Sequence, residues 1–332
     1  MRTRQFFLCV ITFALILGCS SLAMAKAKVT IKAGTAVPES HTIHLAWVKF
    51  KEIIEPRSNG EIEVRIYSNA QLGGDRELIE AAQHGNVSAS NASISPLTPF
   101  NQDFAVFDML FLFGSVEEAR AALDSKLGRH LLASCERINL KALEFMEVGF
   151  RDISNSKHPV TSPDDLKNMK LRTMESPIQI MAWKLVGANP TPVAFSELFT
   201  ALQQKTIDGQ ENPLDLTYLM RFHELQKYFT LTNHLYGASV VMFNLDFWND
   251  LSKEHQDLIT ACMREAVVAQ RELAYQKNME ARQLIRDYGN EITELTPEQR
   301  QAFIDKVAPA FAELEKQVSP EVFKMAKEVL NR

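Results

Sequence analysis

The stretch "KLRTMESPIQI" at residues 170–180 places a permanent positive charge where a strand passes into a helix. The short apolar run around Arg172 predicts a strand, and Ser176 followed by Pro177 predicts a helix start. Unpaired N–H groups at a helix N-terminus favour negative charge, and a nearby guanidinium adds a second anion-seeking group. The stretch therefore predicts a site for a carboxylate or a phosphate, unless Arg172 is only a surface residue at a strand end.

The sequence around this stretch alternates between strand and helix patterns. Residues 28–34 and 61–67 predict strands with a helix between them, and a glycine turn before Asp75 predicts the start of another helix. Residues 141–150 predict a further strand, and after Arg151 the alternation restarts. This regular pattern favours an α/β fold with open sheets over a barrel of hairpins.

The last third of the chain predicts a long helix. From Ser252 to about Tyr288 the sequence has neither Gly nor Pro, and apolar residues recur three and four positions apart. A helix of about 35 residues is about 50 Å long, so we expect it to lie across two lobes. Thr296, followed by a proline and by Gln299, predicts the next helix through a capping box. Two lobes that share a helix predict a cleft between them, and such clefts are common ligand sites.

The N-terminus has the pattern of a secretory signal. Two arginines precede an apolar run over residues 6–17, and small residues end the segment at Ala25, so residues 1–25 are predicted to be a signal peptide. The apolar run is too short to span a bilayer comfortably. A retained membrane anchor and a lipoprotein with its lipid on Cys19 are the alternatives. Either way, we expect an exported protein.

The net charge and the absence of known catalytic motifs limit the classes of function that this protein can have. The net charge is -5 and no block of Lys or Arg stands out, which argues against nucleic acid as a partner. The sequence lacks the phosphate-loop, dinucleotide-binding and serine-hydrolase motifs, so we expect neither a cofactor nor enzyme activity. Glu39, His41 and His44 form a weak metal pattern, but a solvated helix start or a polar ligand contact explains it as well, and we expect no metal. Cys135 and Cys262 are predicted to be buried free thiols rather than a disulfide.

One longer stretch carries a family resemblance. Residues 171–214 begin with "LRTMESP" and end with "GANPTPVAFSELFTALQQKTIDGQENPL", and "NAQLGGDRELIEAAQHG", "GFRDISNS" and "LQKYFTLTNH" support them. With these motifs the sequence resembles the extracytoplasmic solute-binding proteins of tripartite ATP-independent periplasmic (TRAP) transporters. The resemblance covers nearly all of the chain after the predicted signal.

The resemblance implies an architecture and a set of partners. It implies the two-lobed periplasmic binding protein fold, with mixed α/β sheets and a long lobe-spanning C-terminal helix. Lobe 1 would comprise residues 26–150 plus about 237–275, and lobe 2 residues 151–236 plus about 276–332 with the C-terminal helices. The protein would work in the periplasm as a solute-binding protein that delivers its ligand to the TRAP membrane permease, and we expect a monomer.

The resemblance also implies a carboxylate site. Arg172 matches an arginine that makes a two-pronged contact with the ligand carboxylate, Arg151 matches a second anion contact, Asn212 completes the site, and Phe195 lines the cleft. A guanidinium presents a planar fork of donors that Lys cannot reproduce. Structural roles remain the alternatives: an ion pair of Arg172 with Glu175 or Glu211, an ion pair of Arg151 with Asp152 or a role in the hinge, helix capping for Asn212 and core packing for Phe195.

The resemblance also gives further candidate pocket residues, with less specific support, and these candidates bear on the kind of ligand. The additional candidates are Glu39, His41, Ser93, Glu175 and Tyr236. At Pro96 the chain lacks the arginine that sialic-acid-binding members use nearby, so polar candidates without an extra cation favour a sugar acid such as a uronate or aldonate. A C4-dicarboxylate or another small organic acid is the alternative ligand. A ligand-sensing subunit of a membrane receptor and an exported hydrolase or isomerase are the alternative classes.

Overall fold

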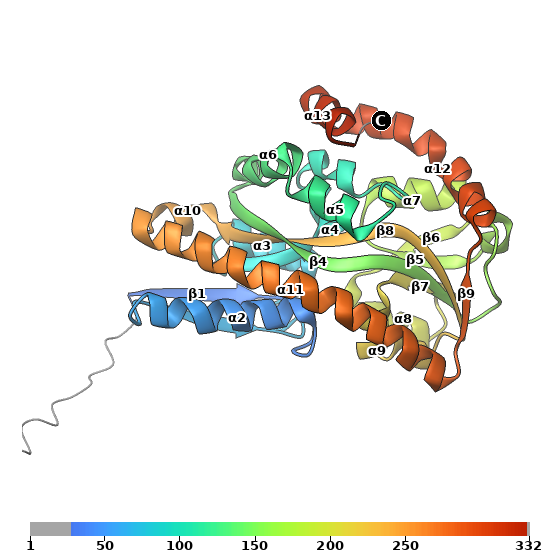
Figure 1. Cartoon of the computed structure of the whole chain (residues 1–332), viewed down its shortest axis with the longest axis horizontal. Helices are drawn as coiled ribbons and strands as arrows, with labels where there is room; N and C mark the ends of the chain where they lie inside the picture. Colours follow the sequence, from blue (N-terminus) through green and yellow to red (C-terminus); the bar gives the residue numbers. More distant parts are fainter. Residues whose placement is uncertain (1–27, 331–332) are drawn as a thin grey trace, which may run out of the picture.

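The computed structural model describes residues 28–330, which form a mixed α/β fold (Figure 1). The predicted signal peptide and Cys19 lie outside the described residues. Within them, nine strands form one sheet in the order β2-β1-β3-β8-β4-β7-β5-β6, with β9 beside β8. The strands are β1 Val29–Gly34, β2 Ile62–Tyr67, β3 Ala89–Ser93, β4 Leu140–Asn155, β5 Lys170–Thr173, β6 Asn189–Pro192, β7 Gly209–Asn212, β8 Tyr228–Asn244 and β9 Glu291–Glu294. The alternating pattern of the sequence is therefore confirmed as an α/β fold.

Two long antiparallel strands, β4 and β8, connect the two lobes. On one side β8 pairs with β3, which continues into the parallel strands β1 and β2; on the other side β4 pairs with β7, which continues into the parallel strands β5 and β6. Gly149 of β4 lies opposite Gly237 of β8, next to a register shift in the ladder. Gly149 has a φ of 105°, a backbone conformation that favours glycine. The crossing lies beside the boundaries expected near residues 150 and 237, although the division into lobes stays a prediction.

The predicted long helix is confirmed as α11, Lys253–Tyr288, with 36 residues. Ser252 caps its start by accepting a hydrogen bond from the His255 N–H, and Gly289 ends it with a φ of 102°. The helix packs against α2 in lobe 1, against β4, and against α9 in lobe 2 (Figure 1). Its length and contacts make it a second connection between the lobes.

The remaining helices surround the sheet. They are α2 Thr42–Arg57, α3 Asp75–Gln83, α4 Ile94–Leu97, α5 Val116–Leu123, α6 Lys126–Ser134, α7 Pro177–Leu185, α8 Leu198–Gln203, α9 Leu214–Leu219 and α10 Leu245–Asn249. Short 3-10 helices are η1 Gln102–Phe107, η2 Cys135–Ile138, η3 Pro163–Leu166, η4 Phe195–Glu197 and η5 Phe222–Glu224. Cys135 and Cys262 are buried and unpaired. Within residues 28–330, no helix combines the length and the apolar character needed to cross a membrane.

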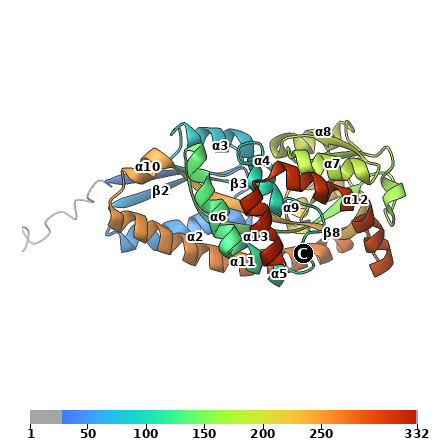
Figure 2. The same ribbon diagram turned by 90° about the horizontal axis from the view of Figure 1, so that it is seen from above.

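The C-terminal helices connect the lobes a third time. Helix α12, Pro297–Gln317, begins with the predicted capping box of Thr296 and Gln299 and packs on α7 of lobe 2. Helix α13, Pro320–Leu330, packs instead against α6 and η1, which precede β4 in the chain. Viewed from above, α13 lies near the middle of the molecule beside α6, and α12 lies over the half that carries α7 (Figure 2). The sequence-based assignment of all these residues to lobe 2 therefore does not describe the contacts of α13.

Candidate ligand-binding site

A cavity with about 660 Å³ of empty space, counting its open mouth, lies between the two lobes. The loop after β1, the start of α3 and the end of β3 line it from lobe 1; the ends of β5 and β7 and the loop before η4 line it from lobe 2. The lobes approach closely at its rim, where a Cβ atom on Gly74 would lie 3.6 Å from Ser196 Oγ. Six residues predicted from sequence line this cavity: Ser93, Arg151, Arg172, Glu175, Phe195 and Asn212.

Arg172 is a buried cation in the cavity wall. The residue is only 2% exposed on β5, and its Nε donates to the carbonyl oxygen of Val193 at 2.9 Å. Its Nη1 lies 3.9 Å from Glu211 Oε1 and has no hydrogen-bond partner within residues 28–330. Burial lowers the pKa of Arg172 to about 10, although the charge of Glu211 opposes this, so the side chain stays charged at neutral pH. A fixed charge with an unused donor is suited to an incoming carboxylate.

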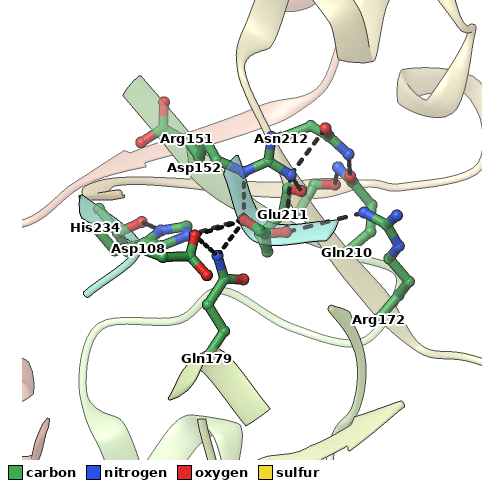
Figure 3. A network of polar contacts seen from close by, with 12 residues as sticks. Asp108, Arg151, Asp152, Arg172, Gln179, Gln210, Glu211, Asn212 and His234 are labelled. Atoms are coloured by element: carbon green, nitrogen blue, oxygen red, sulfur yellow. Dashed lines mark hydrogen bonds and ion pairs between the residues drawn. The ribbon is translucent and has the colours of Figure 1, made fainter. Parts of the chain in front are cut away.

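Arg151 is held by Glu211 (Figure 3). Its Nε and Nη2 donate to the two carboxylate oxygens at 2.6 and 2.8 Å, and Nη2 also donates to the Glu211 carbonyl oxygen and to Asn212 Oδ1. Burial would raise the pKa of Glu211, but the charge and hydrogen bonds of Arg151, together with His234, lower it to about 2. The two side chains therefore form a charged, fully buried pair, and Glu211 sets the orientation of Arg151.

Asn212 completes this group at the end of β7. Its Oδ1 accepts from Arg151 at 2.9 Å, and its amide nitrogen donates to Gln210 Oε1. Gln210 in turn donates to Ser154 Oγ at 2.7 Å. Because a side-chain amide carries two N–H donors, one remains for a ligand. Asn212 precedes Pro213 and α9, but its side-chain contacts are with Arg151 and Gln210, which is a positioning role rather than a helix cap.

Phe195 both lines the cavity and packs into an apolar cluster, the two roles that the sequence offered as alternatives. The half-buried ring lines the cavity, and it also packs edge-on against Phe222 with ring centroids 6.1 Å apart. Phe222 belongs to a small apolar cluster with Leu198 and Leu202. The loop that carries Phe195 is therefore anchored by its own core, and Glu175 lines the same side of the cavity.

The lobe 1 wall carries polar groups beside the apolar side chains of Val37 and Ile43. Asn91 donates from its amide to Ser239 Oγ at 3.0 Å and accepts from Trp47 Nε1 at 2.9 Å. The backbone N–H of Ser93 donates to Asp75 Oδ2 at 3.0 Å. Burial raises the pKa of Asp75, while the N–H of Ser93 and the charge of Arg172 act against this rise. Hydroxyl, amide and carboxylate groups therefore face the arginines across the cavity.

A buried polar cluster lies beside the arginine group. Asp108 Oδ1 accepts from Ser95 Oγ at 2.5 Å and from Gln179 Nε2 at 2.7 Å, so it links the segment after β3 to α7 (Figure 3). Burial raises the pKa of Asp108 to about 6. Ser95 and Asp108 also line a smaller cavity that shares Arg151 and Ser93 with the main one.

Three predicted site residues lie outside the lining of the main cavity. Glu39 is exposed and accepts from Ser68 Oγ at 3.2 Å. His41 is fully buried and caps α2, with its Nδ1 accepting from the Ile43 N–H at 3.2 Å. Tyr236 donates to Glu147 Oε2 at 2.7 Å and lines only the smaller cavity. Their placement gives no support to a direct contact with a ligand in the main cavity.

No metal site assembles in the described part of the chain. Between residues 28 and 330, no group of three His, Cys, Asp or Glu side chains is arranged to hold a metal ion, so Glu39, His41 and His44 do not form one. The sequence candidates for the site do not include several residues that support the arginines or line the cavities with them: Asp75, Asn91 and Asp108, and also Glu211, which the sequence offers only as an alternative ion-pair partner of Arg172. Glu211 had one visible signal, its position directly before Asn212 in the strand of the resembling motif.

A polar, cation-bearing cavity between two lobes joined by long strands and a shared helix defines a class, that of the ligand-capturing binding proteins. Comparison with known proteins is more specific. The family described as "Bacterial extracellular solute-binding protein, family 7" (DctP) matches residues 33–317, and the chain belongs to this family. The two-lobed TRAP binding protein fold expected from the sequence is thereby confirmed.

Individual relatives cover nearly the whole chain. The 2,3-diketo-L-gulonate-binding periplasmic protein YiaO of Escherichia coli is 32% identical over 297 residues, which are 89% of this chain and 90% of YiaO. The sugar acid binding protein DctPAm of Advenella mimigardefordensis, solved in complex with galactonate, has a TM-score of 0.89 at 32% identity and covers 92% of this chain and 98% of its own. A TRAP periplasmic solute binding protein of Sulfurospirillum deleyianum with bound succinate has a TM-score of 0.86 at 30% identity, covering 91% and 99%.

Proposed function

We propose that this protein captures a sugar acid, such as an aldonate or uronate, in the periplasm and delivers it to a TRAP membrane permease. The observation that carries the proposal is the Nη1 of Arg172, a buried cationic donor in the cavity wall that has no hydrogen-bond partner within residues 28–330. A ligand carboxylate would take this donor, and Arg151 and Asn212 stand next to it. The ligand hydroxyls would contact Asn91, Ser93 and Ser239 on the lobe 1 wall.

Binding would be coupled to closure of the lobes. A ligand that contacts both walls binds the closed form better than the open form, so it shifts the equilibrium toward closure. The closed surface is then what the permease would recognise. Uptake of the acid by vesicles that contain the permease, with and without this protein, tests the delivery step.

A thermal-shift screen tests the ligand class. A ligand that binds only the folded state at 100 times its Kd stabilises that state by about 2.7 kcal/mol. We expect D-galactonate and D-galacturonate to raise the midpoint, whereas D-galactose, which has the hydroxyls but no carboxylate, leaves it unchanged. An equal shift with D-galactose would refute the carboxylate site.

A C4-dicarboxylate is the second candidate ligand, because a relative of similar identity is solved with succinate bound. In the same screen, a larger shift with succinate than with either sugar acid would favour this candidate. The cavity lining includes one further arginine, Arg76, but its Nε pairs with Glu80 at 3.2 Å. A second carboxylate would have to displace only this exposed ion pair, which is a weak competitor, so the contact does not decide between the two ligand classes.

A further inference from the structure

His41 and Asp215 form a buried pair of ionisable groups that joins the two lobes. His41 precedes α2 of lobe 1 and is 0% exposed; Asp215 lies on α9 of lobe 2 and is 4% exposed. Their neighbours Ile43 and Leu216 both line the ligand cavity, so the pair lies directly behind one end of it. His41 Nε2 and Asp215 Oδ2 are 3.8 Å apart.

The hydrogen bonds of His41 define which ring nitrogen carries the proton. Nδ1 accepts from the backbone N–H of Ile43, so in the neutral ring the hydrogen resides on Nε2. This Nε2 has no hydrogen-bond partner within residues 28–330, and 3.8 Å exceeds an N–H···O bond by about 0.8 Å. Asp215 Oδ1 already accepts from the Leu216 N–H at 2.7 Å, which leaves Oδ2 as the acceptor that faces the ring.

We propose that His41 and Asp215 form a hydrogen bond between the lobes as the cleft closes fully, and that they thereby set the affinity without touching the ligand. The inference rests on the proposed function, because it requires closure around a ligand. A further approach of the lobes by less than 1 Å would satisfy a donor that is otherwise buried and unpaired. Both residues are therefore positioning residues, which explains why His41 lies outside the cavity lining.

The protonation states of His41 and Asp215 would give the affinity a pH dependence that packing alone would not produce. Burial lowers the pKa of His41 to about 4 and raises that of Asp215 to about 7, the latter with help from the charge of Glu147 on β4. Glu147 is itself paired with Arg120, and the other ionisable groups on the loop of His41 are Glu39 and His44. In an open cleft both groups would titrate near their ordinary values, 6.5 and 3.8.

The two residues should affect the pH dependence of affinity in opposite directions. Burial on closure makes Asp215 more easily protonated, and a hydrogen bond from His41 to its carboxylate opposes this, so between pH 8 and 6 Asp215 alone would raise the affinity by up to about 10-fold as the pH falls. His41 is less easily protonated when buried, and the same hydrogen bond opposes this, so His41 alone would lower the affinity by up to about 4-fold over the same range. In the native protein these effects largely offset each other.

The test compares His41→Asn and Asp215→Asn with the native protein by calorimetric titration of D-galactonate at pH 6 and 8. Asn keeps an oxygen that can cap α2 at position 41 and an acceptor for the Leu216 N–H at position 215. At pH 8 each variant should bind about 2- to 12-fold more weakly, the worth of one hydrogen bond. From pH 8 to 6 the affinity relative to the native protein should rise, by up to about 4-fold, for His41→Asn and fall, by up to about 10-fold, for Asp215→Asn.

The control is His84→Asn, an exposed histidine at the end of α3, which should follow the native protein at both pH values. Circular dichroism melts at each pH establish that the variants are folded. If both variants melt earlier but keep the pH dependence of the native protein, the pair only stabilises the fold and the inference is overturned. If the native protein itself binds neither D-galactonate nor succinate, the proposed function fails instead, and the two failures are distinguishable.

Discussion

The substitution Arg172→Lys tests the geometry of the site because it keeps the charge and removes the fork. Arg172 donates through Nε to Val193 and has Nη1 free of hydrogen bonds to residues 28–330. A lysine ammonium in the same place is a single point charge, so it can replace one of these contacts but not both. The change therefore tests whether one point charge can satisfy both the Val193 carbonyl and a ligand carboxylate, as the guanidinium fork would.

The expected loss follows from one charge-assisted hydrogen bond. Such a bond contributes about 1.5–3 kcal/mol, which corresponds to a roughly 10- to 150-fold weaker affinity. Burial already lowers the pKa of Arg172 to about 10, and it would lower that of a lysine as well. Titration at pH 6.5 therefore favours the charged form of the substituted side chain, so that lost charge adds less to lost geometry than at a higher pH.

Calorimetry with D-galactonate, or with succinate if that acid gives the larger thermal shift, measures the effect. The matched control is Arg65→Lys, an exposed strand arginine that pairs with Glu63 at 2.9 Å, and its affinity should stay within about twofold of the native value. If Arg172→Lys binds the acid as tightly as this control does, Arg172 does not make the proposed contact with the ligand carboxylate, and the site has been assigned to the wrong residue.

Two further predictions concern stability. The substitution Glu211→Gln leaves the guanidinium of Arg151 buried without its charged partner. The free energy of unfolding in urea should therefore fall by about 3–5 kcal/mol. A loss below about 1 kcal/mol would show that the fold does not depend on the pair. Burial raises the pKa of Asp108 to about 6 and the pKa values of Asp152 and Asp215 to about 7, above the ordinary 3.8. Because the folded state binds these protons more tightly than the unfolded state, protonation stabilises the fold. The free energy of unfolding should therefore rise as the pH falls from 8 to 5. Glu211 acts in the opposite sense, but its pKa is lowered from 4.5 to about 2, so its contribution is lost only below about pH 4.5. His41 also acts in the opposite sense: its pKa is lowered from 6.5 to about 4, so it removes about 2 kcal/mol between pH 6.5 and 5, less than the three aspartates together contribute. Greater stability at pH 8 than at pH 5 would contradict this accounting.

Local rules predicted the elements well. The capping residues Ser252 and Thr296 begin α11 and α12 where the sequence places them, because a cap depends only on residues three positions apart. The length of α11 followed from the absence of Gly and Pro. Its span across both lobes followed from geometry alone, since a helix of about 50 Å exceeds a small domain.

The site was predictable only where a motif placed it. Arg172 and Asn212 lie within the resembling stretch and line the cavity as expected. The bond between Arg151 and Glu211 depends on the register of β4 against β7, in which Ile153 pairs with Glu211, and a single sequence does not specify that register. The placement of Tyr236 has a related reason: the residue lines the smaller cavity, and its hydroxyl donates to Glu147.

The charge of the cavity follows from these contacts rather than from a count of arginines. Arg151 and Glu211 compensate each other at hydrogen-bond distance, whereas Arg172 is 3.9 Å from the same carboxylate and retains an unused donor. A carboxylate that accepts two bonds from Arg151 is a weak competitor for Arg172, so the second arginine stays available to a ligand. A pair of equally free arginines would repel each other and favour a doubly charged ligand. By holding one of them, Glu211 leaves Arg172 as the arginine with an unused donor, which matches the one carboxylate of a sugar acid.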